Sequence, residues 1–155
     1  MLQIAKTDEY DLWLAHQMSR PFSFVTPFGG EDFALLLVIA EPGVPNDERH
    51  AVTDKIVRLG CRYACCAGHQ CSEWHDCIDY SYLYSDPGFS PPDEKFIMTT
   101  WHEDESLEDV AFFFRMCTSI DGVVPRHFLV AILGGDAETA LEVRSVVEKS
   151  FSAGV

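Results

Sequence analysis

The chain has 155 residues, of which 47% are hydrophobic, and it carries a formal net charge of −14 at pH 7. The apolar content excludes a disordered chain, and the length suits a single domain with a substantial core. The acidic charge argues against nucleic-acid binding, because it repels the phosphate backbone, and it favours a basic partner, a divalent cation or simply a soluble surface.

The N-terminal segment contains the first regular pattern. Residues 8–18 are expected to form a short helix with Asp8 as its N-cap. Its apolar side would consist of Trp13, Leu14 and Met18. Residues 22–32 then combine a glycine pair with three phenylalanines, which is typical of an extended apolar loop. We therefore expect residues 1–32 to form a helix and an apolar loop packed on the edge of a sheet.

Two observations argue against a leader or a membrane anchor. The start of the chain lacks a basic region followed by an apolar region. The longest apolar run, 33–40, is far shorter than the roughly 20 residues that span a bilayer. We therefore expect a cytoplasmic protein, in which the cysteines are mainly reduced.

Four short apolar runs, separated by amphipathic stretches with helical spacing, follow in the rest of the chain. The runs, each expected to be a strand, are 33–40, 61–67, 96–100 and 127–133. A helix is expected after each run, starting near Asn46, Ser72, Ser106 and Ala137 respectively. Strands that alternate with helices need crossover connections, so the pattern predicts a parallel sheet.

This alternation predicts an α/β fold. We expect residues 1–155 to form a single domain, a three-layer sandwich with a mainly parallel sheet of four or five strands. The pattern is similar to that of flavodoxin-like and Rossmann-like domains, and the strand orders 2-1-3-4 and 3-2-1-4 both remain open. A resemblance of fold implies no activity, and the glycine pattern of dinucleotide-binding domains is absent.

In such sheets, ligands bind beyond the carboxyl ends of the strands. After the third run, the residues considered for a site are Thr100, Trp101, His102, Glu103 and Asp104. His102 with Glu103 would act as acid and base, Glu103 or Asp104 would hold a cation, and the others would line the pocket. Asp104, Glu105 and Ser106 are equally what a helix N-terminus favours, because they complement its dipole and its free N–H groups.

Five of the six cysteines lie between Cys61 and Cys77. Thiolates and imidazoles are the preferred ligands of zinc, and a zinc site here would use Cys66, His69, Cys71 and His75. Cys66 and His69 would also line a pocket at the strand ends. However, the stretch contains no C-x-x-C pair, and a strand cysteine is often a small apolar filler. A further hypothesis is a reactive thiolate at Cys66 or Cys71, because a helix N-terminus stabilises thiolates.

The last strand is followed by Gly134-Gly135-Asp136, and Asp136 would cap the final helix or contribute to the ligand pocket. The helix after Ser106 is apolar almost all round, which indicates deep burial or an interface. The residues expected at a protein interface, with a homodimer as one possibility, are Phe112, Phe113, Met116, Tyr82 and Tyr84.

No catalytic motif such as G-x-S-x-G or H-E-x-x-H fixes a reaction. We favour a small acidic binding protein, of the immunity or inhibitor type, that engages a basic protein partner by electrostatic steering. Such a protein needs no cofactor, nucleic acid or membrane. The alternative is a metal- or ligand-dependent enzyme, with Zn²⁺ or Mg²⁺ as the cation. Its site at the strand carboxyl ends would use His102, Glu103, Cys66 and His69.

Overall fold

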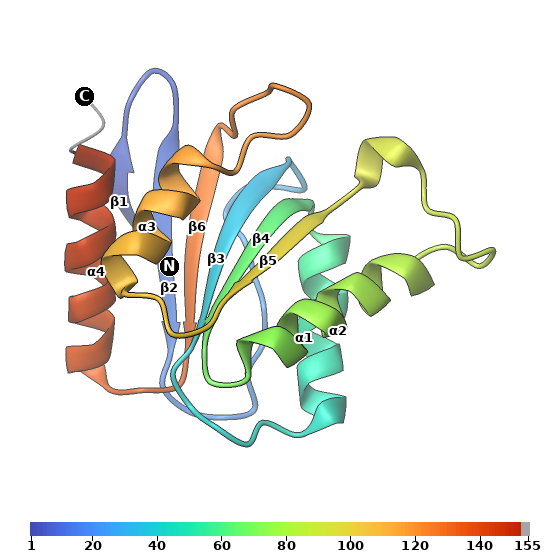
Figure 1. Cartoon of the computed structure of the whole chain (residues 1–155), viewed down its shortest axis with the longest axis horizontal. Coiled ribbons are helices and arrows are strands. Elements are labelled where there is room, and N and C mark those ends of the chain that lie inside the picture. The colour runs from blue at the N-terminus through green and yellow to red at the C-terminus, as the bar shows by residue number, and fades with distance from the viewer. Residues whose placement is uncertain (153–155) are drawn as a thin grey trace.

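The computed structural model describes residues 1–152, and within them the chain forms an α/β fold with one six-stranded sheet and four α-helices (Figure 1). The strands are β1 (Leu2–Lys6), β2 (Asp11–Gln17), β3 (Phe33–Ile39), β4 (Cys61–Gly68), β5 (Met98–His102) and β6 (His127–Leu133). The helices are α1 (Asn46–Arg58), α2 (Cys71–Tyr84), α3 (Leu107–Met116) and α4 (Ala137–Ser152). In this described part, no helix has both the length and the apolar content needed to cross a membrane.

The sheet is mostly parallel, as the alternating pattern predicts. Its order is β1-β2-β6-β3-β4-β5, and among the described strands only β1 and β2 pair antiparallel. The four expected strands therefore follow the order 3-2-1-4, one of the two that the sequence leaves open. All seven residues of β3 are buried, because a central parallel strand is covered on both faces.

Two pairs of helices cover the two faces of the sheet (Figure 1). Beneath α1 and α2, the core contains Leu35, Leu37, Val52, Ile56, Trp74 and Ile78. Beneath α3 and α4, it contains Leu36, Val110, Phe114, Phe128, Val147 and Phe151. Leu35 and Leu36 are neighbours in β3 but belong to different layers, since successive side chains of a strand point to opposite faces.

The prediction of a helix over residues 8–18 is wrong. β1 and β2 form a hairpin there, and β2 runs parallel to β6 from the pair Asp11–His127 to the pair Gln17–Leu133. Asp8 lies in the turn of the hairpin and caps no helix. Leu12 and Leu14 of β2 face the core under α3 and α4, whereas Trp13 and Ala15 pack against the other core. Because both faces of β2 are covered, its sequence lacks a clear polar alternation.

The loop between β2 and β3 is apolar, and it takes the place of a helix. Its side chains Phe22, Phe24 and Phe28 are buried in the core on the α1–α2 side. Phe24 and Phe28 both pack against Phe33 of β3, with ring centroids 6.1 and 5.4 Å apart. The loop therefore covers part of a sheet face rather than the edge of the sheet, where it is expected from the sequence.

β5 begins two residues later than the expected strand 96–100 and extends to His102. Residues 93–95 form a 3-10 turn that precedes it. Trp101 and His102 are therefore strand residues whose side chains point to opposite faces of the sheet, not residues of a loop. This shift decides which of the expected site residues can meet.

Candidate functional site

The carboxyl ends of β3, β4, β5 and β6 meet at one edge of the sheet, at the bottom of Figure 1. The usual ligand crevice of such sheets lies where the connections diverge, here between β3 and β6. A Cβ added to Gly134 would lie 2.4 Å from the Cβ of Glu41, and one added to Gly135 would lie 3.0 Å from the Cβ of Ala40. The loops after β3 and β6 therefore pack directly against each other and fill that crevice.

A pocket of about 450 Å³ opens beside this point, between the ends of β3, β4 and β5 and the first turns of α3 and α4. We call it the carboxyl-edge pocket. Its polar lining residues are His69, His102, Glu105, Thr139 and Glu142. No lysine or arginine of the described residues lines it. The pocket therefore presents carboxylates and imidazoles, with no lysine or arginine to neutralise the carboxylates.

His102 is the most constrained side chain of the carboxyl-edge pocket. The residue is 7% exposed, and Phe113 packs against its ring with centroids 4.8 Å apart. Its Nδ1 lies 3.0 Å from Glu105 Oε2, and its Nε2 lies 2.9 Å from Thr100 Oγ1. With its proton on Nδ1, His102 donates to Glu105 and accepts the Thr100 hydroxyl proton. The result is a hydroxyl–imidazole–carboxylate row, the order of groups found in nucleophile–base–acid triads.

Further acids adjoin the carboxyl-edge pocket. Glu103 and Asp104 are exposed in the turn between β5 and α3. Asp136 caps α4, because its Oδ1 accepts a hydrogen bond of 2.9 Å from the Thr139 N–H. This hydrogen bond lowers the pKa of the Asp136 carboxyl below its usual value. Together with Glu105 and Glu142 of the lining, these acids make the surface here strongly negative.

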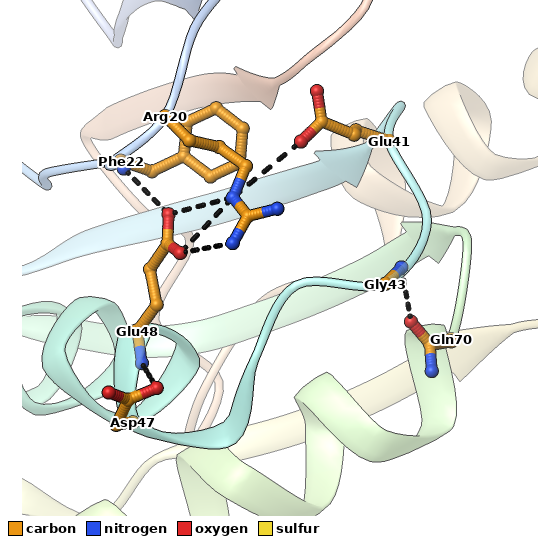
Figure 2. A network of polar contacts seen from close by, with 7 residues as sticks. All are labelled: Arg20, Phe22, Glu41, Gly43, Asp47, Glu48 and Gln70. Carbon is orange, nitrogen blue, oxygen red and sulfur yellow. Dashed lines mark hydrogen bonds and ion pairs between the residues drawn. The ribbon is translucent and has the colours of Figure 1, made fainter.

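Polar contacts hold the neighbouring loops in place (Figure 2). Arg20, after β2, donates from its Nη2 to Oε2 of Glu48 at 2.8 Å, and Glu48 Oε1 accepts the Phe22 N–H at 3.1 Å. The hydrogen bond from Arg20 lowers the pKa of the Glu48 carboxyl. Gln70 Oε1 accepts the Gly43 N–H at 3.1 Å, which ties the loop after β4 to the loop after β3. These hydrogen bonds hold the loops after β2, β3 and β4 in fixed positions.

The structure does not assemble the expected zinc ligands Cys66, His69, Cys71 and His75. Among the described residues, the group of three potential ligands within 4.8 Å of one another is His75, Asp76 and Asp79. Cys66 is fully buried in the core beneath α1 and α2. Burial raises the pKa of the Cys66 and Cys71 thiols, which opposes the expected reactive thiolate at either position.

Trp101 and Cys66 lie on the other side of the sheet from the carboxyl-edge pocket. They are partners in the β4–β5 register, and Cys66 faces the α1–α2 layer. Trp101 packs against His75 of α2, with ring centroids 4.6 Å apart. Of the residues expected to gather at the strand ends, His69 and His102 thus line one pocket, whereas Cys66 and Trp101 do not.

The expected interface residues divide into two kinds. Phe112 and Met116 are more than half exposed and, with Val146, line a groove of about 480 Å³ between α3 and α4. Tyr84 is also exposed, and its ring packs on those of Tyr80 and Phe89. In contrast, Phe113 contacts His102 and Tyr63, and Tyr82 packs edge-on against Phe96. The last two side chains therefore have internal contacts of their own.

Sequence reasoning missed two members of the carboxyl-edge pocket. Glu105 is not one of them, because it belongs to the acidic stretch after the third apolar run, which suits a cation or general-base site as well as a helix cap, and its carboxylate holds His102. Thr139 and Glu142 lie in the first turns of α4 and line the pocket from that side. Their position after Gly134-Gly135 is the available signal, because the first turns of this helix must lie at the same edge of the sheet.

One comparison with known proteins gives a match. A family model described as "Domain of unknown function (DUF7684)" matches residues 13–150, which is most of the chain. No curated protein and no solved structure shows significant similarity to the chain.

Proposed function

The chain belongs to the DUF7684 family of unknown function, and we propose that it is an acidic binding domain that takes a basic side chain of a partner protein into the carboxyl-edge pocket. The observation that carries this proposal is the lining of the pocket: Glu105 and Glu142 face it, and no lysine or arginine of the described chain does.

The charge distribution supports this proposal in two ways, through the net charge of the whole chain and through the acids near the pocket. Over the whole chain, the net charge of −14 draws a basic partner toward the surface and raises the association rate. Near the pocket, Glu103, Asp104 and Asp136 are exposed in the turns that precede its lining residues Glu105 and Thr139. A guanidinium or ammonium group entering the pocket gains carboxylate partners there, which gives the interaction a defined position as well as a favourable charge.

Two larger hollows lie at the opposite, amino edge of the sheet and fit this role less well. They measure about 680 and 730 Å³ and share Asp32, Arg62 and Glu94 in their linings. The first also contains Arg58 and Lys95, so its acids face basic groups of the same chain. A basic ligand would meet like charges there, which makes the carboxyl-edge pocket the better site.

A peptide of alternating arginine and glycine residues is a suitable probe. We expect it to bind the native protein with a salt-sensitive affinity, measured by isothermal titration calorimetry. The double variant Glu105→Gln/Glu142→Gln keeps the shape of the pocket and removes two charges. It should weaken binding about tenfold, equivalent to about 1.4 kcal/mol. The same peptide with citrulline in place of arginine is the neutral counterpart and should not bind.

The matched control is Glu9→Gln/Glu94→Gln, which removes the same charge from exposed positions away from the pocket. This control should change the affinity less than about twofold, because exposed charges at a distance are screened. Equal losses in the two double variants would mean that only net charge attracts the peptide, and the proposed pocket would then have to be abandoned.

The row Thr100–His102–Glu105 favours a second candidate, an enzyme that cleaves acyl esters. His102 Nε2 would take the Thr100 hydroxyl proton while Oγ1 attacks the carbonyl carbon, and the same proton would then pass to the leaving alcohol. A water molecule, deprotonated by His102 in turn, would then release the acyl group from Oγ1 as a carboxylic acid. Hydrolysis of p-nitrophenyl acetate tests this candidate. If it is right, Thr100→Val and His102→Gln should each lower the rate about 100-fold or more. Rates equal to those of the parent protein would exclude it.

A further inference from the structure

A second cluster of ligating side chains lies on the opposite side of β5 from the carboxyl-edge pocket. It consists of His75, Asp76 and Asp79, all of which belong to α2. Trp101 of β5 packs against the ring of His75, with centroids 4.6 Å apart. Thr99 of β5 donates its hydroxyl proton to Asp79 Oδ1 at 2.7 Å. The cluster is therefore held from both α2 and β5, and the proposed function does not involve it.

The hydrogen bonds of His75 define which nitrogen is free. Its Nδ1 lies 2.9 Å from Asp76 Oδ1, which is the length of a hydrogen bond to a carboxylate. A neutral imidazole with its proton on Nδ1 carries its lone pair on Nε2. That Nε2 faces Asp79 Oδ2 at 3.6 Å, a distance too long for a hydrogen bond. Two electron-pair donors therefore face each other across a gap, and a cation between them would satisfy both.

The gap has the dimensions of a metal site. Two ligands bound to a tetrahedral zinc ion at about 2.0–2.1 Å lie about 3.4 Å from each other. The observed separation of 3.6 Å between His75 Nε2 and Asp79 Oδ2 is close to this value. We infer that His75 and Asp79 bind a divalent transition-metal ion of the Zn²⁺ type, with Nε2 and Oδ2 as the two ligand atoms.

The surroundings of the two ligands are those of a metal site. Metal-binding histidines usually donate their other ring N–H to a carboxylate, and Asp76 accepts that proton here. Thr99 orients the Asp79 carboxylate in the same way. Among the described residues, no lysine or arginine forms an ion pair with Asp76 or Asp79. Both aspartates are exposed, so water can fill the remaining coordination positions.

The test uses the full chain, stripped of metal with a chelator and titrated with ZnSO₄ by isothermal titration calorimetry. We expect saturable binding of one ion per chain. His75→Gln removes the nitrogen ligand, and Asp79→Asn replaces the charged oxygen ligand by an amide of the same shape. Each should weaken binding at least about tenfold. The control His50→Gln removes an exposed histidine of α1 that belongs to neither site and should leave the affinity unchanged.

A spectroscopic signal locates the ion independently. Trp101 is about half exposed and touches His75, so NiSO₄ bound at this site should quench its fluorescence. Trp101→Phe should abolish that quenching while Zn²⁺ still binds. The inference is overturned if Zn²⁺ does not bind saturably, or if His75→Gln and Asp79→Asn bind it as tightly as the parent. It is also overturned if the loss of binding occurs with His50→Gln instead.

Discussion

Replacement of Gly68 by alanine is expected to destabilise the protein by about 3–4 kcal/mol, one of the largest effects of any single substitution. Gly68 is the last residue of β4 and has φ +91°. An added Cβ would lie 2.2 Å from the carbonyl oxygen of Ile39 and 3.0 Å from its amide nitrogen. These are backbone atoms of the central strand β3, which cannot move aside as a side chain can. The free energy of unfolding, measured by urea denaturation, tests this expectation.

Gly122→Ala is the matched control for Gly68→Ala. Gly122 also has a positive φ, +77°, but nothing lies within 4 Å of the position of an added Cβ. This variant should therefore lose only the cost of the backbone conformation, about 1–2 kcal/mol. The difference between the two variants measures the close approach of β4 to β3. Equal decreases in the free energy of unfolding of the two variants would contradict this close approach of β4 to β3.

Phe114→Ala is expected to cost about 3–5 kcal/mol, because it empties the centre of the core beneath α3 and α4. Phe114 is fully buried, and its ring packs edge-on against those of Phe128 and Phe151, with centroids 5.3 and 5.8 Å apart. The loss combines the hydrophobic transfer of the ring with the cavity that remains. A fall in the midpoint of urea denaturation without a change in its slope is the expected observation.

Phe112→Ala, two residues earlier on the same helix, provides the comparison. Phe112 is 59% exposed and lies on the outer side of α3. Its removal should change the free energy of unfolding by no more than about 0.5 kcal/mol. A large loss for Phe112→Ala in the isolated chain would mean that the outer side of α3 is covered, as it would be in a dimer. Sedimentation of the parent protein shows whether such a dimer forms.

The elements that sequence reasoning predicts well are those with a local cause. β6 occupies 127–133 as expected, since an apolar run without polar alternation is typical of a buried parallel strand. Ser106 caps α3 as expected, with its Oγ accepting from the Asp109 N–H at 3.1 Å. The signal for each feature is contained in a few consecutive residues, although β6 itself pairs with the distant strands β2 and β3.

β2 is missed because its identity depends on distant residues. Trp13 and Leu14 are adjacent apolar residues, which suits a helix as well as a strand covered on both faces. What makes 11–17 a strand is its pairing with β6, more than a hundred residues away in the sequence. No local pattern contains that partner.

The candidate site is predicted in part for a similar reason. His69 and His102 end neighbouring strands, so the topology alone brings them to one edge of the sheet. The prediction that Cys66 and Trp101 line this pocket is wrong, because their side chains point to the other face of the sheet. A strand residue one position along the chain would point toward the pocket. Glu142 comes from α4 and lies far along the chain from His69, His102 and Glu105, so no short sequence motif contains it together with them.

The pairing of β2 with β6 also constrains the order in which the protein can fold. β2 joins the sheet only through β6, and β1 joins it only through β2. During synthesis, the first strands of the chain are made early, yet their docking site is completed only when residues 127–133 have left the ribosome. Such long-range contacts slow folding, because a long loop must close before they form. The N-terminal hairpin is therefore the last part of the sheet to acquire its neighbours, and a nascent chain must keep Leu12 and Leu14 from other apolar surfaces until then.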